Sequence, residues 1–154
     1  MGERYVIAAE SPDTVAAREL IGELEDALGA LYPAESRHGY SVDKLIREGV
    51  HFFVLRVGEA PAACGGIQFY PGFAELKRMY VRPDWRGRGL GRAVLEHLEA
   101  HARSEGCRLV RLETGVHQAE GIRLYERSGF AGIGAFPPYR PDRLSLFYEK
   151  DLGE

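Results

Sequence analysis

The chain contains the stretch Val81-Arg82-Pro83-Asp84-Trp85-Arg86-Gly87-Arg88-Gly89-Leu90-Gly91-Arg92, which joins a strand-like run to a helix-like run. Its three glycines let the backbone turn tightly and approach a ligand closely, because glycine has no Cβ. The helix that follows presents unpaired N–H groups and about half a positive charge at its first turn. Four arginines against one aspartate give the stretch a charge of +3, in a chain whose formal charge is −3. These features predict a site for an anion such as a polyphosphate.

Other kinds of glycine-rich turn differ in their spacing. A dinucleotide-binding fold requires Gly-x-Gly-x-x-Gly after a first strand, with an acidic residue about 20 positions later. Here the glycines stand at positions 87, 89 and 91 and follow several strand-like runs, so an NAD-dependent oxidoreductase is disfavoured. A P-loop fails because no Gly-Lys-Ser/Thr closes the turn. From these residues alone, a tight connection with solvated arginines is an equal alternative to an anion site.

The composition of the whole chain is that of an ordinary globular domain, expected to span residues 1–154. Of its residues, 45% are hydrophobic and 28% charged, and the acidic balance argues against nucleic acid as a partner. No apolar run approaches the ~18 residues of a membrane span and no secretion pattern opens the chain, so we expect no membrane association and a cytoplasmic location.

Cysteines and histidines do not form a metal-binding pattern. Cys64 and Cys107 lack CxxC spacing, and we expect buried free thiols that play no part in catalysis. His97 and His101 lie one helical turn apart, but the glutamate that a metalloprotease motif requires directly after the first histidine is missing, and a solvated helix face is favoured. The sequence therefore predicts no metal.

Hydrophobic periodicity predicts alternating strands and helices. A strand at Tyr5–Ala9 precedes a helix that Ser11-Pro12 begins and Gly29 ends, and Ser41 caps a shorter helix that stops at Gly49. The later elements are strands at 51–57, 62–70 and 73–81, a helix up to Gly106, a strand at 107–114, a helix at 119–128, and strands at 130–136 and 144–150. The order β-α-α-β-β-β-α-β-α-β-β predicts an α/β fold with one central mixed sheet.

Three motifs in this order resemble the GCN5-related N-acetyltransferase (GNAT) family. Arg86-Gly87-Arg88-Gly89-Leu90-Gly91 matches the family's coenzyme A loop, Gln/Arg-x-x-Gly-x-Gly/Ala. Glu75-Leu76-Lys77-Arg78-Met79-Tyr80-Val81 resembles the family's fourth strand, and Leu124-Tyr125-Glu126-Arg127-Ser128-Gly129-Phe130 its Leu-Tyr-x-x-x-Gly-Phe segment. The match is clear over residues 73 to 130. It implies a single-domain GNAT-like fold, with a central mixed, mostly antiparallel sheet, a splayed middle and about four flanking helices.

The resemblance implies acetyl-CoA as the donor and assigns its site. In the family the loop amides hold the pyrophosphate of the coenzyme, and the strand before the loop binds the pantetheine arm and polarises the thioester carbonyl through its backbone. Gln118 stands where family members often carry asparagine, and its amide is a further candidate for the pantetheine. The implied coenzyme-binding residues are Met79, Tyr80, Val81, Arg86, Gly87, Arg88, Gly89, Leu90, Gly91, Arg92 and Gln118.

Tyr125 and Glu75 are the catalytic residues that the resemblance implies. Tyr125 matches the tyrosine beside the departing sulfur. Since a thiol has a pKa near 8.5 and tyrosine one near 10, full proton transfer runs uphill by roughly 2 kcal/mol, and a hydrogen bond to the developing thiolate is the expected role. Glu75 stands fourteen residues before Gly89, where some family members carry a base. An amine with a pKa near 10.4 is mostly protonated at pH 7, so a base assists its attack.

Structural roles for both residues stay open. Tyr125 follows Ile122 by three positions on the same helical face, and without the resemblance a core aromatic residue is the preferred interpretation. Glu75 is expected to share a strand face with Lys77, Met79 and Val81 by the two-residue period, and a surface glutamate paired with Lys77 or an arginine is an equal alternative to a base. Glu113, at the end of the next strand, is the reserve base.

The sequence predicts an acetyl-CoA-dependent N-acetyltransferase that acts by direct transfer in a ternary complex. Its acceptor is a primary amine of a small molecule, amino-acid-like or a polyamine, or of a peptide. The alternative is a module that binds acetyl-CoA or CoA without catalysis. The resemblance leaves a homodimer open. Acceptor contacts are expected in residues 20–40 and 136–143, with Tyr32, Tyr139, Arg140, Asp142 and Arg143 as candidates.

Overall fold

The computed structural model describes residues 4–37 and 41–153, and within them the predicted order of elements is confirmed. The helices are α1 (Val15–Leu31), α2 (Val42–Arg47), α3 (Leu90–Ser104) and α4 (Ala119–Arg127). The strands are β1 (Val6–Ala9), β2 (His51–Val57), β3 (Ala60–Tyr70), β4 (Phe73–Val81), β5 (Leu109–Gly115), β6 (Ala131–Ile133) and β7 (Ser145–Asp151). Two short 3₁₀ helices, η1 (Ala34–Ser36) and η2 (Pro83–Trp85), are additions that the sequence did not predict.

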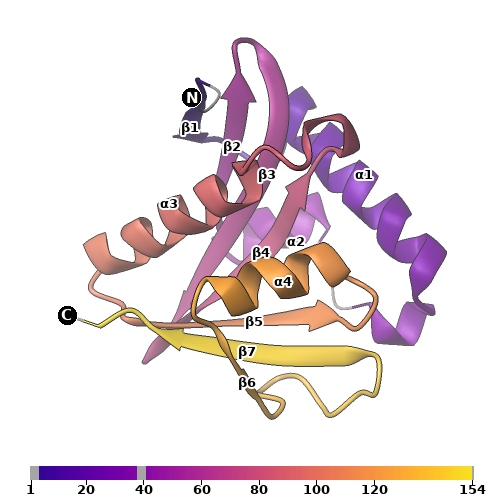
Figure 1. The fold of residues 1–154 in the computed structure, drawn as a ribbon, viewed down its shortest axis with the longest axis vertical. Helices are drawn as coiled ribbons and strands as arrows, with labels where there is room; N and C mark the ends of the chain where they lie inside the picture. Colours follow the sequence, from indigo (N-terminus) through magenta and orange to yellow (C-terminus); the bar gives the residue numbers. More distant parts are fainter. Residues whose placement is uncertain (1–3, 38–40, 154) are drawn as a thin grey trace.

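All seven strands form one sheet in the order β1-β2-β3-β4-β5-β7-β6 (Figure 1). Every neighbouring pair is antiparallel except β4 and β5, which are parallel because α3 carries the chain over the sheet between them. β4 and β5 pair through only two residues each and then diverge, so the sheet opens in its middle. The expected mixed, mostly antiparallel and splayed sheet is confirmed.

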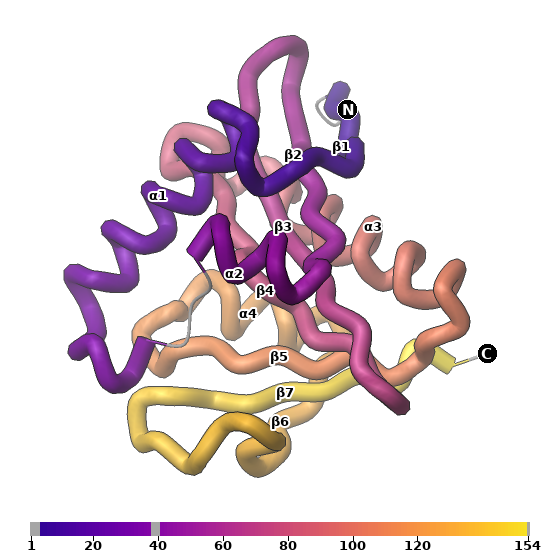
Figure 2. The backbone as a smooth tube through the Cα atoms, turned by 180° about the vertical axis from the view of Figure 1, so that it is seen from behind, coloured from indigo at the N-terminus to yellow at the C-terminus, as the bar shows by residue number. Residues whose placement is uncertain are grey.

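Helices cover both faces of the sheet, with α3 and α4 on one face and α1 and α2 on the other (Figures 1 and 2). Val94, Leu95 and Leu98 of α3 pack into the first hydrophobic core, and Leu20 of α1 and Leu45 of α2 pack into the second. The sheet therefore separates two cores, and a ligand that enters the opening between β4 and β5 reaches both sides of it.

Close packing of α3 on the sheet depends on Gly65 in β3. A Cβ at Gly65 would lie 2.7 Å from Met79 Sδ and 2.8 Å from Val94 Cγ1, which is shorter than van der Waals contact. The missing side chain lets α3 lie directly against β3 and β4. α3 begins where the glycine-rich loop ends, so this packing also fixes the position of the loop.

Capping side chains set the starts of the first two helices. Thr14 caps α1, because its Oγ1 accepts a hydrogen bond of 3.2 Å from Ala17 N. The expected start at Ser11-Pro12 is therefore three residues too early, and Ser11 instead accepts a bond from Asp13 N. Ser41 caps α2 through Lys44 N, as predicted.

A β-bulge at Arg78 interrupts the alternation of β4. The register changes from Cys64 opposite Tyr80 to Gly66 opposite Lys77, so β4 carries one extra residue, and Arg78 adopts a φ of 56°. Side chains before and after the bulge consequently point to different faces. Glu75 and Lys77 face the α1 side, as do Leu24 and Leu28 of α1 in the same cleft, whereas Met79 and Val81 pack into the core under α3. The expectation that all four share one face is wrong for Met79 and Val81.

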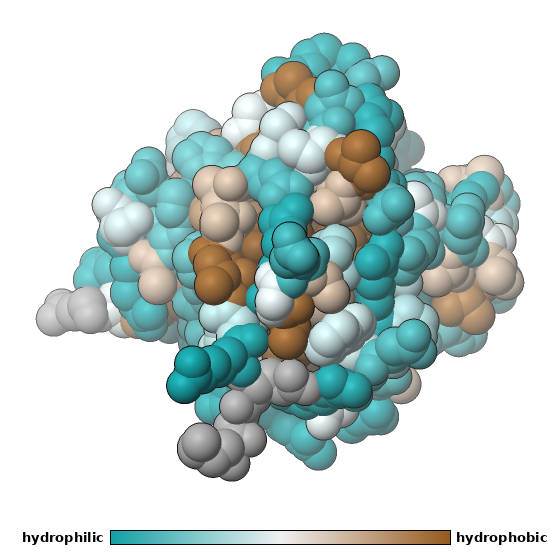
Figure 3. Space-filling view, turned by 90° about the horizontal axis from the view of Figure 1, so that it is seen from above, coloured by the Kyte–Doolittle hydropathy of each residue, from teal (hydrophilic) through white to brown (hydrophobic). Residues whose placement is uncertain are grey.

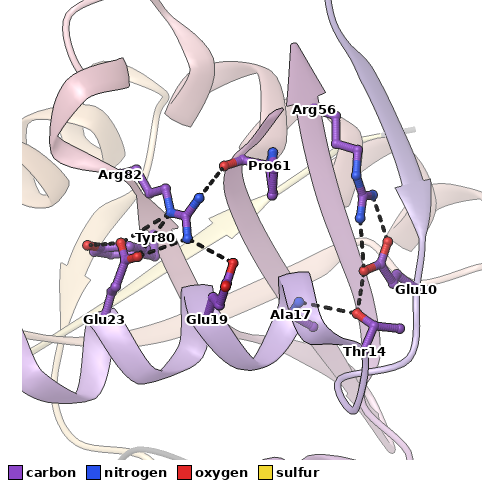
Figure 4. A network of polar contacts seen from close by, with 9 residues as sticks. All are labelled: Glu10, Thr14, Ala17, Glu19, Glu23, Arg56, Pro61, Tyr80 and Arg82. Atoms are coloured by element: carbon purple, nitrogen blue, oxygen red, sulfur yellow. Dashed lines mark hydrogen bonds and ion pairs between the residues drawn. The ribbon is translucent and has the colours of Figure 1, made fainter. Parts of the chain in front are cut away.

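Polar contacts fasten α1 across the end of β4 (Figure 4). The Arg82 guanidinium contacts Glu23 Oε2 at 2.9 Å and Glu19 Oε1 at 3.3 Å, and it donates to the carbonyl of Pro61. Tyr80 donates its hydroxyl to Glu23 at 3.2 Å. Arg82 therefore belongs to the contact with α1, and its charge does not serve the glycine-rich loop that follows.

The view from above shows a mainly hydrophilic surface in which hydrophobic residues form small separate groups (Figure 3). The large exposed hydrophobic side chains lie at the start of β1, at the two ends of α1 and in α2. They are Tyr5, Val6, Val15, Leu31 and Ile46. None of the helices that the structure describes has the length and apolar character needed to cross a membrane.

Candidate active site

The opening between β4 and β5 leaves one edge of β4 without a neighbouring strand. Only Ala74 and Glu75 of β4 pair with β5, opposite Val110 and Arg111. Beyond them, at residues 76–81, the backbone groups that point toward β5 have no strand to bond. An extended ligand can pair with such an edge as an added strand, through main-chain hydrogen bonds that do not depend on side-chain identity.

The glycine-rich loop continues from this edge into an open helix N-terminus. Gly87 and Gly89 both have a φ of 78°, in the left-handed region that suits glycine. Gly89 is the N-cap of α3 and provides no capping side chain, and the first helical hydrogen bond runs from Ala93 N to Gly89 O at 3.1 Å. The amides of residues 90–92 precede that bond, so they point out of the helix toward a bound anion.

The loop arginines lie against neighbouring groups in different ways. Arg86 donates to the carbonyl of Val81 at 2.9 Å, and the Arg88 guanidinium stacks 4.8 Å from the centre of the Trp85 ring. Arg92 forms an exposed pair with Glu96 one turn along α3. With Arg82 bound to α1, three arginines remain around the loop rather than the four counted in the sequence.

The side chains of several predicted coenzyme residues are occupied in packing. Leu90 is buried in the α3 core, Met79 and Val81 pack into the same core, and Tyr80 reaches the α1 side. A Cβ on Gly91 would lie 3.4 Å from Val81 Cγ2 and from Leu124 Cδ2. These residues can therefore contact a coenzyme mainly through their backbone, in keeping with the role predicted for Met79, Tyr80 and Val81.

A cleft lies at the opening and takes its lining from both sides of the sheet. The lining combines α1 and η1, the middle of β4, the end of β5, α4 with its N-cap, and the loop before β7. Four of the predicted site residues line it, namely Glu75, Met79, Gln118 and Tyr125, together with the reserve base Glu113. The remaining lining residues are Leu24, Leu28, Tyr32, Ser36, Arg37, Leu76, Lys77, Arg78, Leu112, Thr114, Gly115 and Tyr139.

Glu75 is a buried member of a three-residue polar group. Its residue is 1% exposed, and its Oε2 lies 3.1 Å from Lys77 Nζ and accepts a hydrogen bond of 2.5 Å from the hydroxyl of Tyr139. Lys77 Nζ also donates to the Tyr139 hydroxyl at 3.2 Å. The alternative prediction of a glutamate on the surface is wrong because Glu75 is buried, but the predicted ion pair with Lys77 is confirmed. Among the described residues, Glu75 Oε1 is buried and accepts no hydrogen bond.

Tyr125 is buried beside the cleft and packs edge-on against Phe130, with ring centres 5.8 Å apart. Burial raises the pKa of its phenol well above the ordinary value of tyrosine, and the negative charge of Glu113 adds to the rise. The phenol therefore keeps its proton at neutral pH and can donate a hydrogen bond. The structural reading of Tyr125 as a core aromatic residue is confirmed, and because it also lines the cleft its catalytic role stays a prediction.

Tyr32, the C-cap of α1, reaches across the cleft to the start of α4. Its hydroxyl accepts a bond of 2.8 Å from His117 N and donates to Gln118 Oε1 at 3.2 Å. Burial raises the pKa of its phenol, and the bond from the His117 amide opposes that rise. A Cβ on Gly115 would lie 2.0 Å from the same hydroxyl, so this contact requires glycine there. The side-chain oxygen of Gln118, the predicted pantetheine ligand, therefore already accepts a hydrogen bond from Tyr32.

The loop before β7 provides some of the expected acceptor residues. Tyr139 lines the cleft, and Asp142 accepts a bond of 2.9 Å from Ser36 of η1, which joins two segments of its wall. Arg140 and Arg143 are exposed and lie outside the lining.

The last residues of the 20–40 range, in which acceptor contacts were also expected, fall outside the described residues. Lys77 and Arg37 line the cleft and were missed, although Lys77 stands within the strand motif that pointed to Glu75.

No cysteine or histidine among the described residues lines this cleft. Cys64 is buried, and burial raises the pKa of its thiol to about 12, so it is not a nucleophile. His97 and His101 pack edge-on against Phe53 rather than on a solvated face, and desolvation lowers the pKa of both. Within residues 4–37 and 41–153, no group of three or more His, Cys, Asp or Glu side chains has the arrangement of a metal site.

Comparisons with known proteins agree with this geometry. Residues 17–130 match the sequence model of the Acetyltransferase (GNAT) family. The chain is 47% identical over 148 residues to a protein of Azospirillum brasilense named IAA acetyltransferase, and the match covers 95% of this chain and 97% of that relative.

Solved structures give the same result. A Klebsiella pneumoniae protein assigned as an acyl-CoA N-acyltransferase has a TM-score of 0.83 and 36% identity, over 97% of this chain and 98% of that one. The PaiA N-acetyltransferase of Thermoplasma acidophilum, solved in complex with coenzyme A, has a TM-score of 0.77 over 96% of this chain and 99% of that one. Its identity is 20%, so this second likeness shows the fold alone.

Proposed function

The chain belongs to the acetyltransferase (GNAT) family and is an N-acetyltransferase, and from this premise we propose that it transfers the acetyl group of acetyl-CoA to a primary amine. The acceptor amine belongs to a small molecule, amino-acid-like or a polyamine, or to a peptide. One observation carries the proposal: the free edge of β4 runs from an open helix N-terminus to a cleft that Glu75 and Tyr125 line. A long donor with an anionic end and a reactive end suits this path.

The proposed donor site is made of backbone groups. The amides of residues 87–92 would hold the pyrophosphate, supported by the two left-handed glycines and by the charges of Arg86, Arg88 and Arg92. The edge of β4 at residues 76–81 would pair with the pantetheine arm and direct amides at the thioester carbonyl. Preorganised amides in such a place stabilise the tetrahedral oxyanion, which is a large contribution to acyl transfer.

The proposed reaction is direct. The amine nitrogen attacks the thioester carbon, the C–S bond breaks with its electron pair on sulfur, and the surplus proton of the amine leaves to Glu75. Tyr125 donates a hydrogen bond to the developing thiolate; its raised pKa disfavours full proton transfer. The buried Cys64, with its thiol pKa of about 12, does not support an acyl-enzyme. Positioning of the two substrates supplies much of the remaining acceleration.

A panel of amines tests this function. We expect the purified chain to release thiol from acetyl-CoA only when a suitable amine is present, with an acetylated product in equal amount. The panel contains the amino acids, their amides, spermidine and short peptides, and also IAA, after which the Azospirillum brasilense relative is named. If CoA raises the melting temperature of the chain but no amine yields acetylated product, the proposed acceptor class is wrong.

A further inference from the structure

Lys77 and Glu75 form a buried ion pair inside the acceptor side of the cleft. Glu75 is 1% exposed and Lys77 6%, and Nζ of Lys77 lies 3.1 Å from Oε2 of Glu75. Tyr139 holds the pair from a distant loop, since its hydroxyl contacts both groups. The three polar groups thus contact one another at buried positions, and these contacts hold the ammonium of Lys77 beside Glu75.

Glu75 keeps one oxygen for another partner. Among the described residues no donor reaches Oε1, although the atom is buried, and a buried carboxylate oxygen without a hydrogen bond is costly. The residue lines the cleft, but Oε1 itself is closed to solvent, so an N–H group of a bound acceptor reaches this oxygen only after a small shift of the surrounding side chains. An amine in that position lies roughly 4–6 Å from Lys77 Nζ, close enough for the two nitrogens to influence each other's charge.

A buried carboxylate without Lys77 would be a poor partner for a nucleophilic amine. It would either take up a proton because burial disfavours its charge, or hold the acceptor as an ammonium ion, which has no lone pair to attack with. The fixed charge of Lys77 removes both problems. A positive charge at this distance favours the charged form of a neighbouring carboxylate, and it opposes a second positive charge on the acceptor.

We propose that Lys77 is a positioning residue for acetyl transfer, whose ammonium compensates Glu75 so that the acceptor binds beside this carboxylate as the neutral amine. The inference rests on the proposed function, because it takes the acceptor to bind at Glu75. It assigns Glu75 to accept the hydrogen bond and then the proton of the amine. Lys77 itself acts through Glu75 and through its charge, without entering the reaction.

Other titratable and charged groups also face this part of the cleft. From α1 and the segment after it come Tyr32 and Arg37, from the β4 bulge Arg78, from β5 Glu113, and from α4 Tyr125. Arg78 is ion-paired with Glu25 of α1, and both tyrosines have a raised phenol pKa and remain neutral at pH 7. Glu113 is a second charged residue in this cleft that could affect the pH dependence of the reaction. The variant Glu113→Gln is therefore measured together with the Lys77 variants, so that the effects of the two residues can be separated.

The test is the dependence of kcat on pH, which reports groups in the bound complex. With the amine that the wild type uses fastest in the panel above, we expect Lys77→Met to move the acid limb of kcat upward by about 1–2 pH units. Lys77→Arg keeps the positive charge, so we expect its acid limb to move by less than about half of the shift seen in Lys77→Met. An acid limb that stays in place in Lys77→Met, with only a lower kcat, overturns the proposal.

Lys150→Met is the matched control for the loss of a lysine from an ion pair. Lys150 contacts the buried Glu99 at 3.1 Å on the α3 side of the sheet, away from the cleft. We expect it to lower the melting temperature without moving the acid limb. If Lys150→Met moves the limb as far as Lys77→Met does, the effect comes from stability and the proposal is wrong.

A second measurement does not depend on any acceptor. The side-chain carboxyl of Glu75 can be followed by ¹³C NMR in the full chain with CoA bound, and assigned with Glu75→Gln. We expect it to titrate at a higher pH in Lys77→Met than in the wild type and in Lys77→Arg. Identical titrations in wild type and Lys77→Met reject charge compensation. A wild type that acetylates no amine rejects the proposed function instead.

Discussion

The two sides of the opening between β4 and β5 are built in different ways. The proposed donor side, residues 76–92, is one continuous segment that offers backbone groups: the free edge of β4, two left-handed glycines and the first turn of α3. The acceptor side consists of side chains from segments far apart in the sequence, such as Tyr32, Glu75 and Tyr139. A backbone site needs one local motif, whereas a side-chain site needs the whole fold.

This difference explains how one scaffold can keep its donor and change its acceptor. Substitutions that preserve the backbone of residues 76–92 should leave the proposed coenzyme contacts in place, because the side chains of Met79, Val81 and Leu90 pack into the core. On the acceptor side each substitution changes a contact directly. Variants on the two sides should therefore affect different quantities, and the following predictions separate coenzyme affinity from turnover.

The largest effect is expected on the acceptor side, from Glu75→Gln. Loss of a base that assists proton removal lowers kcat/KM by about 10²–10⁴-fold, and the isosteric amide retains most of the packing. Coenzyme affinity, measured by calorimetry, should stay within about threefold because the donor side is intact. Glu113→Gln is the comparison. A greater loss of activity in Glu113→Gln than in Glu75→Gln would assign the base to Glu113.

On the donor side, Gly89→Val should weaken coenzyme binding by about 10²-fold. A residue with a Cβ is strained at a φ of 78°, so the loop must change and the helix amides lose their alignment. Gly72→Val is the control, since Gly72 has a φ of 88° in the turn between β3 and β4 and also has open space around it. An equal loss of coenzyme affinity in both variants would show that backbone strain anywhere in the fold causes the loss, and that the loop has no special role.

Tyr125→Phe tests the group that lies between the two sides. It should lower kcat by about tenfold, the value of one hydrogen bond to a developing charge, while the dissociation constant of CoA changes little. The buried phenol has no hydrogen bond within the described residues, so the variant should fold with similar stability. An unchanged kcat would show that Tyr125 only packs against Phe130.

The smallest effect is expected from Tyr32→Phe, which leaves the ring and removes the bonds to His117 N and Gln118. We expect a loss of about 1–2 kcal/mol in the free energy of unfolding, together with a higher acceptor KM and an unchanged coenzyme affinity. Tyr148→Phe, which removes a bond of 2.9 Å to Glu126, is the control for stability alone. A rise in acceptor KM in Tyr148→Phe would remove the special role of Tyr32.

The backbone geometry of residues 76–92 could be predicted from the sequence because its signals are local, and their role as the donor side stays a prediction. Glycines at 87 and 89 mark the left-handed turn, and the motifs around them mark the strand and the helix in the correct order. The order of elements follows from hydrophobic periodicity for the same reason. The helix start at Thr14 was missed because Ser11, Asp13 and Thr14 are all residue types that can cap a helix N-terminus, and the sequence does not show which of them does so.

The acceptor side could not be predicted in detail because its contacts are not local. The bulge at Arg78 moves Met79 and Val81 to the other face, and arginine gives no sign of a positive φ. Tyr139 and Glu75 are 64 residues apart, so no pattern in the sequence shows that their side chains meet. Burial of Lys77 likewise depends on the loop that covers it.

Amide hydrogen exchange with and without CoA tests the central claim most directly. If the donor site is made of backbone groups, CoA should slow exchange of the amides in residues 76–81 and 87–92, which have no strand or helix partner on the side facing the ligand. The acceptor loop at residues 136–144 should change little. Protection confined to residues 136–144, with none in 76–92, would contradict a donor site along β4 and the start of α3.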